Sequence, residues 1–302
     1  MQPLSNENES SIKQGLVISY FGNSVAVEMP DGQVFQCHLR RNQDLPVVGD
    51  HVTWQLEKSH MGVILSILPR RSLLSRGNER GEMKPLAANI DLLFIVMAPP
   101  PIFSEYLIDR YLIAAELLSI QAVLVLNKID LMDDHTKASM EERLTPYRAI
   151  YPVYLSSAIS QEGLATLVPC FKGKNSVLIG PSGVGKSSMI AGLCQQASIR
   201  VGQVSPKGSG KHTTTSSSLY HLLEGGHVID SPGVREFSLW RVSKEDIFTG
   251  FKEFQGLDDC KFRDCIHLQE PGCVVKTAVL NGEISKKRYE SYQKLILSVT
   301  SG

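Results

Sequence analysis

The sequence lacks a net charge, a long apolar run and a secretion signal. Its 302 residues carry 31 lysines and arginines and 31 aspartates and glutamates. No overall basic field therefore favours nucleic acid, and any nucleic-acid surface must be local. No apolar run is long enough to span a bilayer, and residues 1–10 lack the basic-then-apolar layout of a signal peptide. We expect a cytoplasmic protein without membrane contact, and a disordered tail over residues 1–12.

Cysteine is scarce and unevenly placed, with six residues in the chain. Three of them are isolated among apolar neighbours and are expected to be small buried side chains, namely Cys37, Cys170 and Cys194. The other three lie near the C-terminus together with a histidine. This clustering in a cytoplasmic chain favours a metal site over disulfides.

The C-terminal cluster has the form Cys260-x4-Cys265-x-His267-x5-Cys273. Three thiolates and one imidazole are a complete tetrahedral ligand set for Zn²⁺. Because the set leaves no position open for substrate, we expect one structural zinc ion. The alternative is a group of unrelated cysteines. The zinc would hold together a small α-helical domain, residues 243–302, that has little apolar core of its own.

Residues 13–72 are predicted to be all-β. Five short apolar or alternating segments are separated by short turns such as Pro30-Asp31-Gly32. This pattern is typical of a small closed barrel such as the OB-fold, which often binds nucleic acids. Arginines at the strand ends favour RNA contacts, although a solvated linker explains them almost as well. The candidates are Arg40, Arg41, Arg70 and Arg71.

From residue 89 the pattern changes to alternating strands and helices, after a linker over residues 73–88. Buried apolar runs at 90–97, 122–126, 153–155 and 177–179 alternate with helical spacing. This alternation predicts an α/β domain over residues 89–242 with a doubly wound, mostly parallel sheet. In such sheets ligands bind at the carboxyl ends of the strands.

The stretch Gly180–Ser187 matches the phosphate-binding loop G-x-x-x-x-G-K-[ST] at every fixed position. Its glycines allow backbone N–H groups to surround phosphate oxygens. We expect Lys186 to reach the β- and γ-phosphates and Ser187 to hold Mg²⁺. The alternative is a glycine-rich turn that caps a helix. The predicted contacts are Gly180, Pro181, Ser182, Gly183, Val184, Gly185, Lys186, Ser187 and Ser188.

Three further motifs end predicted strands of the same domain. They are Asn127-Lys128-Ile129-Asp130, Ser156-Ser157-Ala158 and Asp230-Ser231-Pro232-Gly233. Each alone could be a turn, but together with the phosphate loop they form a coherent set. The Asp130 carboxylate can accept two parallel hydrogen bonds from guanine, whereas adenine would present an acceptor. The motifs therefore predict GTP, with Asn127 and the Lys128 stem framing the base and a backbone N–H near Ala158 contacting O6.

The motifs are those of translation-factor-like GTPases, but Asn127 precedes Gly180, which reverses the usual order and indicates a circular permutation. Barrel, permuted domain and cysteine cluster together resemble the RsgA family, also called YjeQ or YloQ, over residues 14–299. The resemblance includes the signature that starts at Asp230. It implies a GTPase that binds the small (30S) ribosomal subunit and its rRNA and hydrolyses GTP to GDP when stimulated by the subunit. It also implies a role in late small-subunit assembly, and we expect a monomer.

The predicted mechanism lacks one common group. The position after Gly233 is Val234, where many GTPases place a glutamine that orients the attacking water. Because valine cannot orient the water, we expect slow hydrolysis. The candidate that replaces the glutamine is His212, which lies in a segment rich in Gly, Ser, Thr and Lys. The resemblance points to the same residue, although His212 could instead contact a partner or solvent. We expect catalytic roles for His212, Lys186 and Gly233.

The expected Mg²⁺ site has three members. They are Ser187, Asp230 acting through water, and Thr214, the last chosen by family resemblance among residues 213–215. Basic residues on the final predicted helix, including Lys287 and Arg288, suit RNA, and a solvated helix face suits them nearly as well. Two other functions stay open. One is a P-loop ATPase or small-molecule kinase, and the other is an RNA-binding scaffold with a vestigial nucleotide site.

Overall fold

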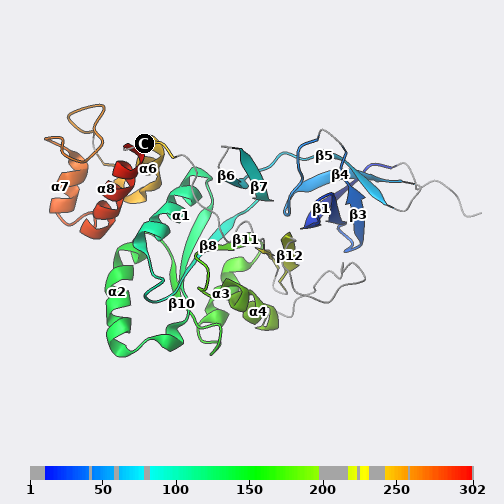
Figure 1. The fold of residues 1–302 in the computed structure, drawn as a ribbon, viewed down its shortest axis with the longest axis horizontal. Helices are drawn as coiled ribbons and strands as arrows, with labels where there is room; N and C mark the ends of the chain where they lie inside the picture. The colour runs from blue at the N-terminus through cyan, green and yellow to red at the C-terminus, as the bar shows by residue number, and fades with distance from the viewer. Residues whose placement is uncertain are drawn as a thin grey trace, which may run out of the picture. The chain divides into compact units, whose positions relative to one another are not determined.

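The computed structural model describes residues 11–40, 43–57, 61–77, 82–196, 217–222, 225–230, 242–257 and 259–300 (Figure 1). These residues belong to two compact units. The first takes in what is described of Met1–Leu92, Leu167–Leu178 and Ile190–Phe237. The second takes in what is described of Leu93–Thr166, Ile179–Met189 and Ser238–Gly302. Among the described residues, no helix is both long and apolar enough to cross a membrane.

The first unit begins with a closed five-stranded barrel. Its strands pair in the order β1-β2-β3-β5-β4, and β1 also pairs with β4, which closes the barrel. The predicted barrel is confirmed. The Phe35 ring lies against the buried Trp54 in a tilted contact, with 4.7 Å between the ring centroids. The strands are β1 (Lys13–Tyr20), β2 (Ser24–Glu28), β3 (Val34–His38), β4 (His51–Leu56) and β5 (Gly62–Ile67).

The rest of the first unit adds two groups of strands. The segment expected to be a linker contains an antiparallel hairpin, β6 (Leu73–Gly77) and β7 (Met83–Ala88). Three later strands extend from the barrel, because β12 pairs with β1 on one side and with β13 on the other, and β13 pairs in parallel with β11. These strands are β11 (Asn175–Ile179), β12 (Ser217–His221) and β13 (His227–Asp230).

The second unit contains the strands β8 (Leu92–Met97), β9 (Gln121–Leu126) and β10 (Val153–Leu155), in the order β10-β9-β8. Every residue of β8 is buried, as a central strand requires. Between the strands run α1 (Glu105–Leu117), the short η1 (Ile129–Leu131) and α2 (Asp134–Arg148). Ser104 caps α1 and Asp133 caps α2 through the N–H groups of the first turn.

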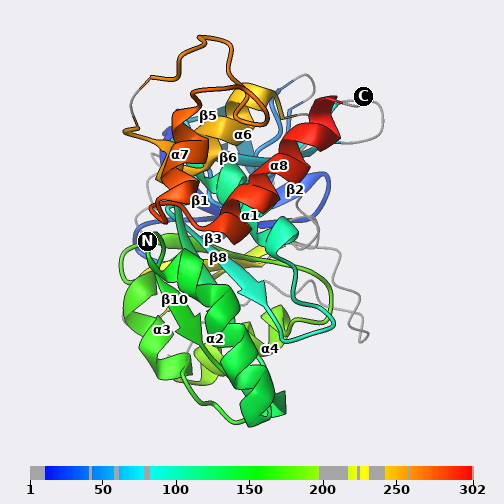
Figure 2. The same cartoon turned by 90° about the vertical axis from the view of Figure 1, so that its left-hand side faces the viewer.

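Further helices complete the described part of the chain. Next in sequence come α3 (Leu164–Phe171) and α4 (Lys186–Gln196). The C-terminal part holds α6 (Lys244–Gly250), η2 (Lys252–Phe254), α7 (Val274–Leu280) and α8 (Lys286–Thr300). Both α6 and α8 pack on α1, as Figures 1 and 2 show. Ile113 of α1 belongs to the same buried cluster as Phe251 and Tyr292, so the helical part and α1 share one core.

Candidate functional site

The phosphate loop needs its glycines because other backbone and side-chain atoms lie against it. Gly180 has φ +142°, and a Cβ there would lie 2.1 Å from the Val96 carbonyl oxygen. Gly185 has φ +95°, and a Cβ there would lie 2.4 Å from Asn127 Nδ2. No L-side chain fits either position. The loop that precedes α4 is therefore a bare backbone turn at a helix N-terminus, which is a suitable surface for an anion.

Lys186 points its ammonium group back to the mouth of this loop. Its Nζ donates to the carbonyl oxygens of Gly180 and Pro181, both at 2.7 Å, and the residue is only 6% exposed. Ser187 and Ser188, the next two residues, are exposed. A fixed buried cation beside exposed hydroxyls supplies the charge and the oxygen ligand that a phosphate with its metal ion requires.

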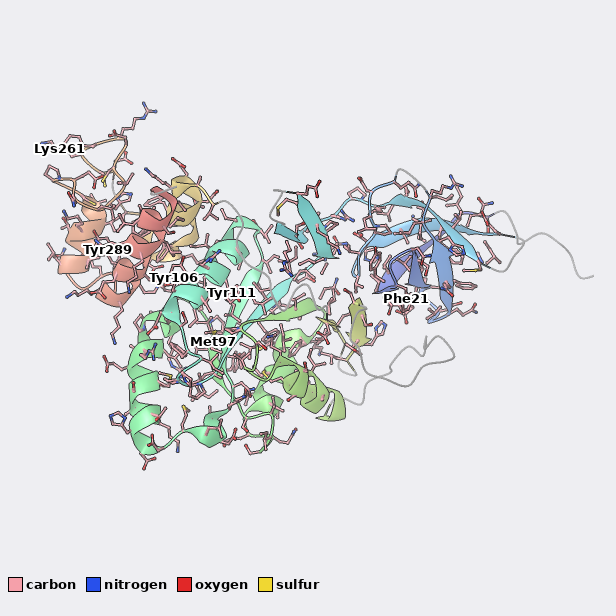
Figure 3. All side chains as sticks on the ribbon, viewed as in Figure 1. Phe21, Met97, Tyr106, Tyr111, Lys261 and Tyr289 are labelled. Atoms are coloured by element: carbon pink, nitrogen blue, oxygen red, sulfur yellow. The ribbon has the colours of Figure 1, made fainter. Side chains whose placement is uncertain are left out.

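Asn127 joins the phosphate loop to the two base-recognition motifs. Its Nδ2 donates to the Val184 carbonyl at 2.8 Å, and its Oδ1 accepts from the Ala158 N–H at 3.1 Å. Its backbone N–H donates to the carbonyl of Met97, the last residue of β8, which Figure 3 labels. Asn127 is 1% exposed. The predicted members of the site from three separate segments therefore meet in one unit, although the Ala158 N–H is directed to Asn127 here.

Asp130 is exposed and its orientation is fixed by a buried serine. Ser157 Oγ donates to Asp130 Oδ1 at 2.5 Å and accepts from the Ser160 N–H at 3.1 Å. Lys128 has φ +66°, and its Cε lies 3.7 Å from where a Cβ of residue 185 would stand. The lysine stem therefore runs toward the phosphate loop. An anchored, exposed carboxylate beside a lysine stem suits a planar base with adjacent N–H donors.

Several predicted residues lie outside the described part of the chain. They are Arg41, His212, Thr214 and Gly233. Asp230 is described and is the last residue of β13. The roles expected of these residues in catalysis and Mg²⁺ binding stay predictions.

The four metal-ligand candidates meet in the second unit. Their ligand atoms all lie within 4.8 Å of one another. His267 Nδ1 lies 3.5 Å from the sulfurs of Cys260 and Cys265 and 3.4 Å from that of Cys273. Tetrahedral zinc with bonds of about 2.3 Å to sulfur and about 2.05 Å to nitrogen would place these atoms about 3.6 Å apart. The residues therefore fit a zinc ion, with Nδ1 as the histidine ligand.

The ligand loop is held by groups that sequence reasoning did not assign. The Glu270 carboxylate accepts the N–H groups of Ile266, Leu268 and Gln269 at 2.9–3.0 Å. Burial acts to raise its pKa, but the backbone N–H groups outweigh it, so the pKa lies below the usual range. Glu270 lies three residues from a ligand, but nothing in the sequence distinguishes a turn-forming carboxylate from a solvated one.

Two tyrosines of α8 complete this support. Tyr289, labelled in Figure 3, donates to the His267 carbonyl at 2.7 Å. Tyr292 donates to the Ile266 carbonyl at 3.1 Å. The His267 ring also stacks on Phe248 with 4.7 Å between centroids. The histidine is therefore fixed by aromatic packing and by its own backbone, as expected around metal ligands.

The structure corrects part of the RNA-contact prediction. Arg288 is 2% exposed, and its guanidinium pairs with Glu253 and with Asp109. The prediction of an RNA contact for Arg288 is wrong, because no face of the guanidinium is left for a phosphate. Arg70 is also engaged, since its Nε and Nη2 donate to the buried Asp50 at 2.8 and 2.7 Å.

The other basic candidates face solvent. Arg40 is exposed, and the Arg71 side chain is 67% exposed although it pairs with Asp91 at 2.6 Å. Lys287 is about half exposed and pairs with Glu142 at 2.7 Å. Surface pairs of this kind are weak and exchange easily. These three residues keep a side chain that an RNA phosphate could reach.

Comparison with known proteins agrees with this geometry. The RsgA GTPase family model matches residues 67–240. A protein of Pseudomonas putida named small ribosomal subunit biogenesis GTPase RsgA is 44% identical over 99% of this chain and 89% of its own length. A protein of Pseudomonas fluorescens with the same name is 45% identical over 95% of this chain and 86% of its own. The chain belongs to the RsgA GTPase family.

Solved structures of RsgA GTPase family proteins extend over the same length. The crystal structure of YjeQ from Thermotoga maritima has a TM-score of 0.79 and 33% identity, covering 97% of this chain and all of its own. The structure of YloQ, described as a circularly permuted GTPase, has a TM-score of 0.76 and 29% identity, covering 99% and 98%. The permuted motif order is therefore a feature that this chain shares with a solved relative.

Proposed function

We propose that this chain is a GTPase of small-ribosomal-subunit biogenesis that binds the 30S subunit and its rRNA and hydrolyses GTP to GDP and phosphate. Membership of the RsgA GTPase family supports the activity. The observation that carries the nucleotide site is Asn127, which joins the phosphate loop at Val184 to the base-recognition loop at Ala158. The protein works in the cytoplasm as a monomer.

Guanine selectivity rests on Asp130. Its carboxylate would accept hydrogen bonds from the N1–H and the N2 amine of the base, while Ser157 keeps the carboxylate oriented. The Asp130→Asn variant should lose GTP affinity and gain xanthosine triphosphate affinity, because the amide offers a donor to the xanthine O2. Competition against a fluorescent nucleotide measures both. Unchanged guanine preference in this variant would show that Asp130 does not read the base.

Hydrolysis depends on residues from three segments. Lys186 neutralises charge on the β- and γ-phosphates, and the Gly233 N–H contacts the γ-phosphate. Ser187, Thr214 and Asp230, the last through water, would hold Mg²⁺, which neutralises developing phosphate charge when bound. Val234 cannot orient water, so His212 performs this task. The free protein is consequently slow, and the docked protein is faster.

One Zn²⁺ would be held by Cys260, Cys265, His267 and Cys273, and it would cross-link the loop before α7 to the helical part of the chain.

The residues that would contact RNA are Arg40, Arg41, Arg71 and Lys287. Arg70 in the first unit and Arg288 in the second are left out of the proposal because their side chains pair with internal carboxylates.

A turnover assay with and without small subunits tests the whole proposal. We expect GTP hydrolysis to rise when 30S subunits are added and not when 50S subunits are added. The His212→Ala variant should bind GTP and subunits but lose the stimulation. Preference for ATP in the competition assay would favour a kinase or ATPase instead, and GTP binding without turnover under either condition would favour a scaffold.

A further inference from the structure

Helix α8 contacts the metal-ligand loop with one set of side chains. Tyr289 and Tyr292 donate to the carbonyls of His267 and Ile266, at 2.7 and 3.1 Å. Both tyrosines are buried. A metal that fixes the ligands of this loop would therefore also fix the two carbonyls that bond to α8.

The same helix is fixed to α1 by Arg288, the residue next to Tyr289. The Arg288 guanidinium donates to Glu253 Oε1 at 2.6 Å and to the carboxylate of Asp109, which lies on α1 and is fully buried. The guanidinium also lies 4.4 Å from the Phe251 ring centroid. A buried charge pair of this kind has strict geometry, because a displaced partner leaves an uncompensated charge. The pair therefore ties α8 to α1.

Helices α1 and α2 lead back to the nucleotide loops. Ile102, just before α1, has its Cδ1 3.8 Å from where a Cβ of Gly183 would stand in the phosphate loop. Helix α2 begins at Asp134, shortly after Asp130. Arg143 of α2 and Glu105 of α1 form a two-pronged pair at 2.6 Å, which ties the two helices together.

We propose that the metal and the guanine nucleotide bind cooperatively, with α8 as the connecting element. The inference rests on the proposed function, since it assumes that both ligands bind at the sites described above. With metal bound, the loop carbonyls hold α8 on α1 and the nucleotide loops are prearranged. Without metal, the nucleotide must supply that ordering, and its affinity falls. Linkage requires the reverse effect of equal size, so GDP must tighten metal binding.

The first experiment uses the wild-type full-length protein. GDP affinity is measured by titration calorimetry with the metal present and after its removal by a chelator. Zinc affinity is measured by competition with a chromophoric chelator, with and without saturating GDP. We expect both affinities to change by the same factor, about 5-fold or more.

The second experiment removes the connection and keeps every metal-ligand and nucleotide-loop residue. The double variant Tyr289→Phe with Tyr292→Phe deletes two hydroxyls and keeps the rings that pack in the core. We expect it to bind both ligands, with a coupling factor that falls toward one. Tyr20→Phe is the matched control, because its hydroxyl also donates to a carbonyl, that of Gly22 at 2.6 Å, but in the barrel. The control should keep the wild-type factor.

The outcomes separate this inference from the proposed function. Failure of the wild-type protein to bind GDP at all would overturn both. GDP binding whose affinity is the same with and without metal would overturn the coupling alone. Full coupling retained in the double tyrosine variant would overturn α8 as its route. If the double variant loses its fold, Tyr289→Phe alone replaces it, and the wild-type measurement still decides whether coupling exists.

Discussion

The nucleotide loops differ from the basic residues of α8 and of the barrel in how the sequence encodes their function. In the nucleotide loops, the candidate residues belong to short contiguous motifs, and Lys186 and Asp130 are each held by a partner in the same or a neighbouring motif. The basic residues form no motif, and their availability depends on distant partners. Arg288 pairs with Asp109 and is lost to RNA, whereas its neighbour Lys287 stays at the surface. A motif therefore predicts which residues form a candidate site, whereas a count of charges does not.

The largest effect is expected from a substitution in the nucleotide loops. Lys186→Ala removes the buried ammonium group at the phosphate loop. We expect turnover with small subunits to fall by about 100-fold or more, because one preorganised charge contact to the transition state is lost. Single-turnover hydrolysis measures the change. Lys137→Ala, at an exposed position of α2 outside the nucleotide loops, should change turnover little. A full-rate Lys186→Ala protein would contradict the assignment of the loop.

Arg288→Ala tests the basic residues in this comparison, and its expected effect is a loss of stability. Its removal leaves the buried Asp109 and the nearly buried Glu253 without their cation. We expect the free energy of unfolding to fall by about 3–5 kcal/mol. Urea unfolding measures it. Lys286→Ala, whose side chain is 83% exposed two positions away, should stay within about 0.5 kcal/mol of wild type. Weakened RNA affinity at unchanged stability would restore the RNA role.

A smaller effect is expected from pH at His227, whose Nδ1 lies 2.6 Å from Asn175 Oδ1. Burial first, and then His221 and His51, lower the pKa of His227 to about 4, against the opposing effect of Asp91. The unfolded chain binds this proton near pH 6.5 and the folded chain only near pH 4. Stability is therefore complete above pH 6.5 and is lost as the pH falls toward 4, by about 1–2 kcal/mol after allowance for solvent screening.

Unfolding of His227→Gln at pH 7 and pH 5 measures this contribution. The variant should lose less stability between these values than the wild-type protein, because glutamine does not titrate. His135→Gln, at an exposed position of α2, is the matched control and should keep the wild-type dependence. Equal pH dependence in all three proteins would contradict the lowered pKa.

The smallest effect is expected at Arg71. Its pair with Asp91 is solvent-exposed, so Arg71→Ala should cost roughly 0.2–1 kcal/mol of stability. If Arg71 contacts rRNA, the salt dependence of subunit binding should weaken by about one counterion. Filter binding over a range of salt concentrations measures this slope. An unchanged slope would show that Arg71 makes only its intramolecular pair with Asp91 and no rRNA contact. Arg71 would then differ further from the motif residues.

The sequence predicts those features whose cause is local. The phosphate loop follows from adjacent residues, and the barrel follows from short strands between turn signals. The burial of Arg288 does not, because its partner Asp109 lies 179 positions earlier in the chain. The hairpin of β6 and β7 also escaped prediction, since Pro85 interrupts the pattern and a β-bulge shifts the register between Leu74 and Ser75. Glu270 was missed because its task, accepting backbone N–H groups, needs no particular spacing.

The pairing of β1 with β12 has a consequence for how the chain can be divided. Ser19 and Tyr20 of the barrel lie opposite Ser218 and Ser217, so the barrel covers a row of backbone donors and acceptors on β12. Without residues 1–72, that row would be an uncovered strand edge, which is a template for another chain. A shortened protein would therefore tend to associate with itself through this edge. The barrel thus protects the β12 edge from pairing with another chain.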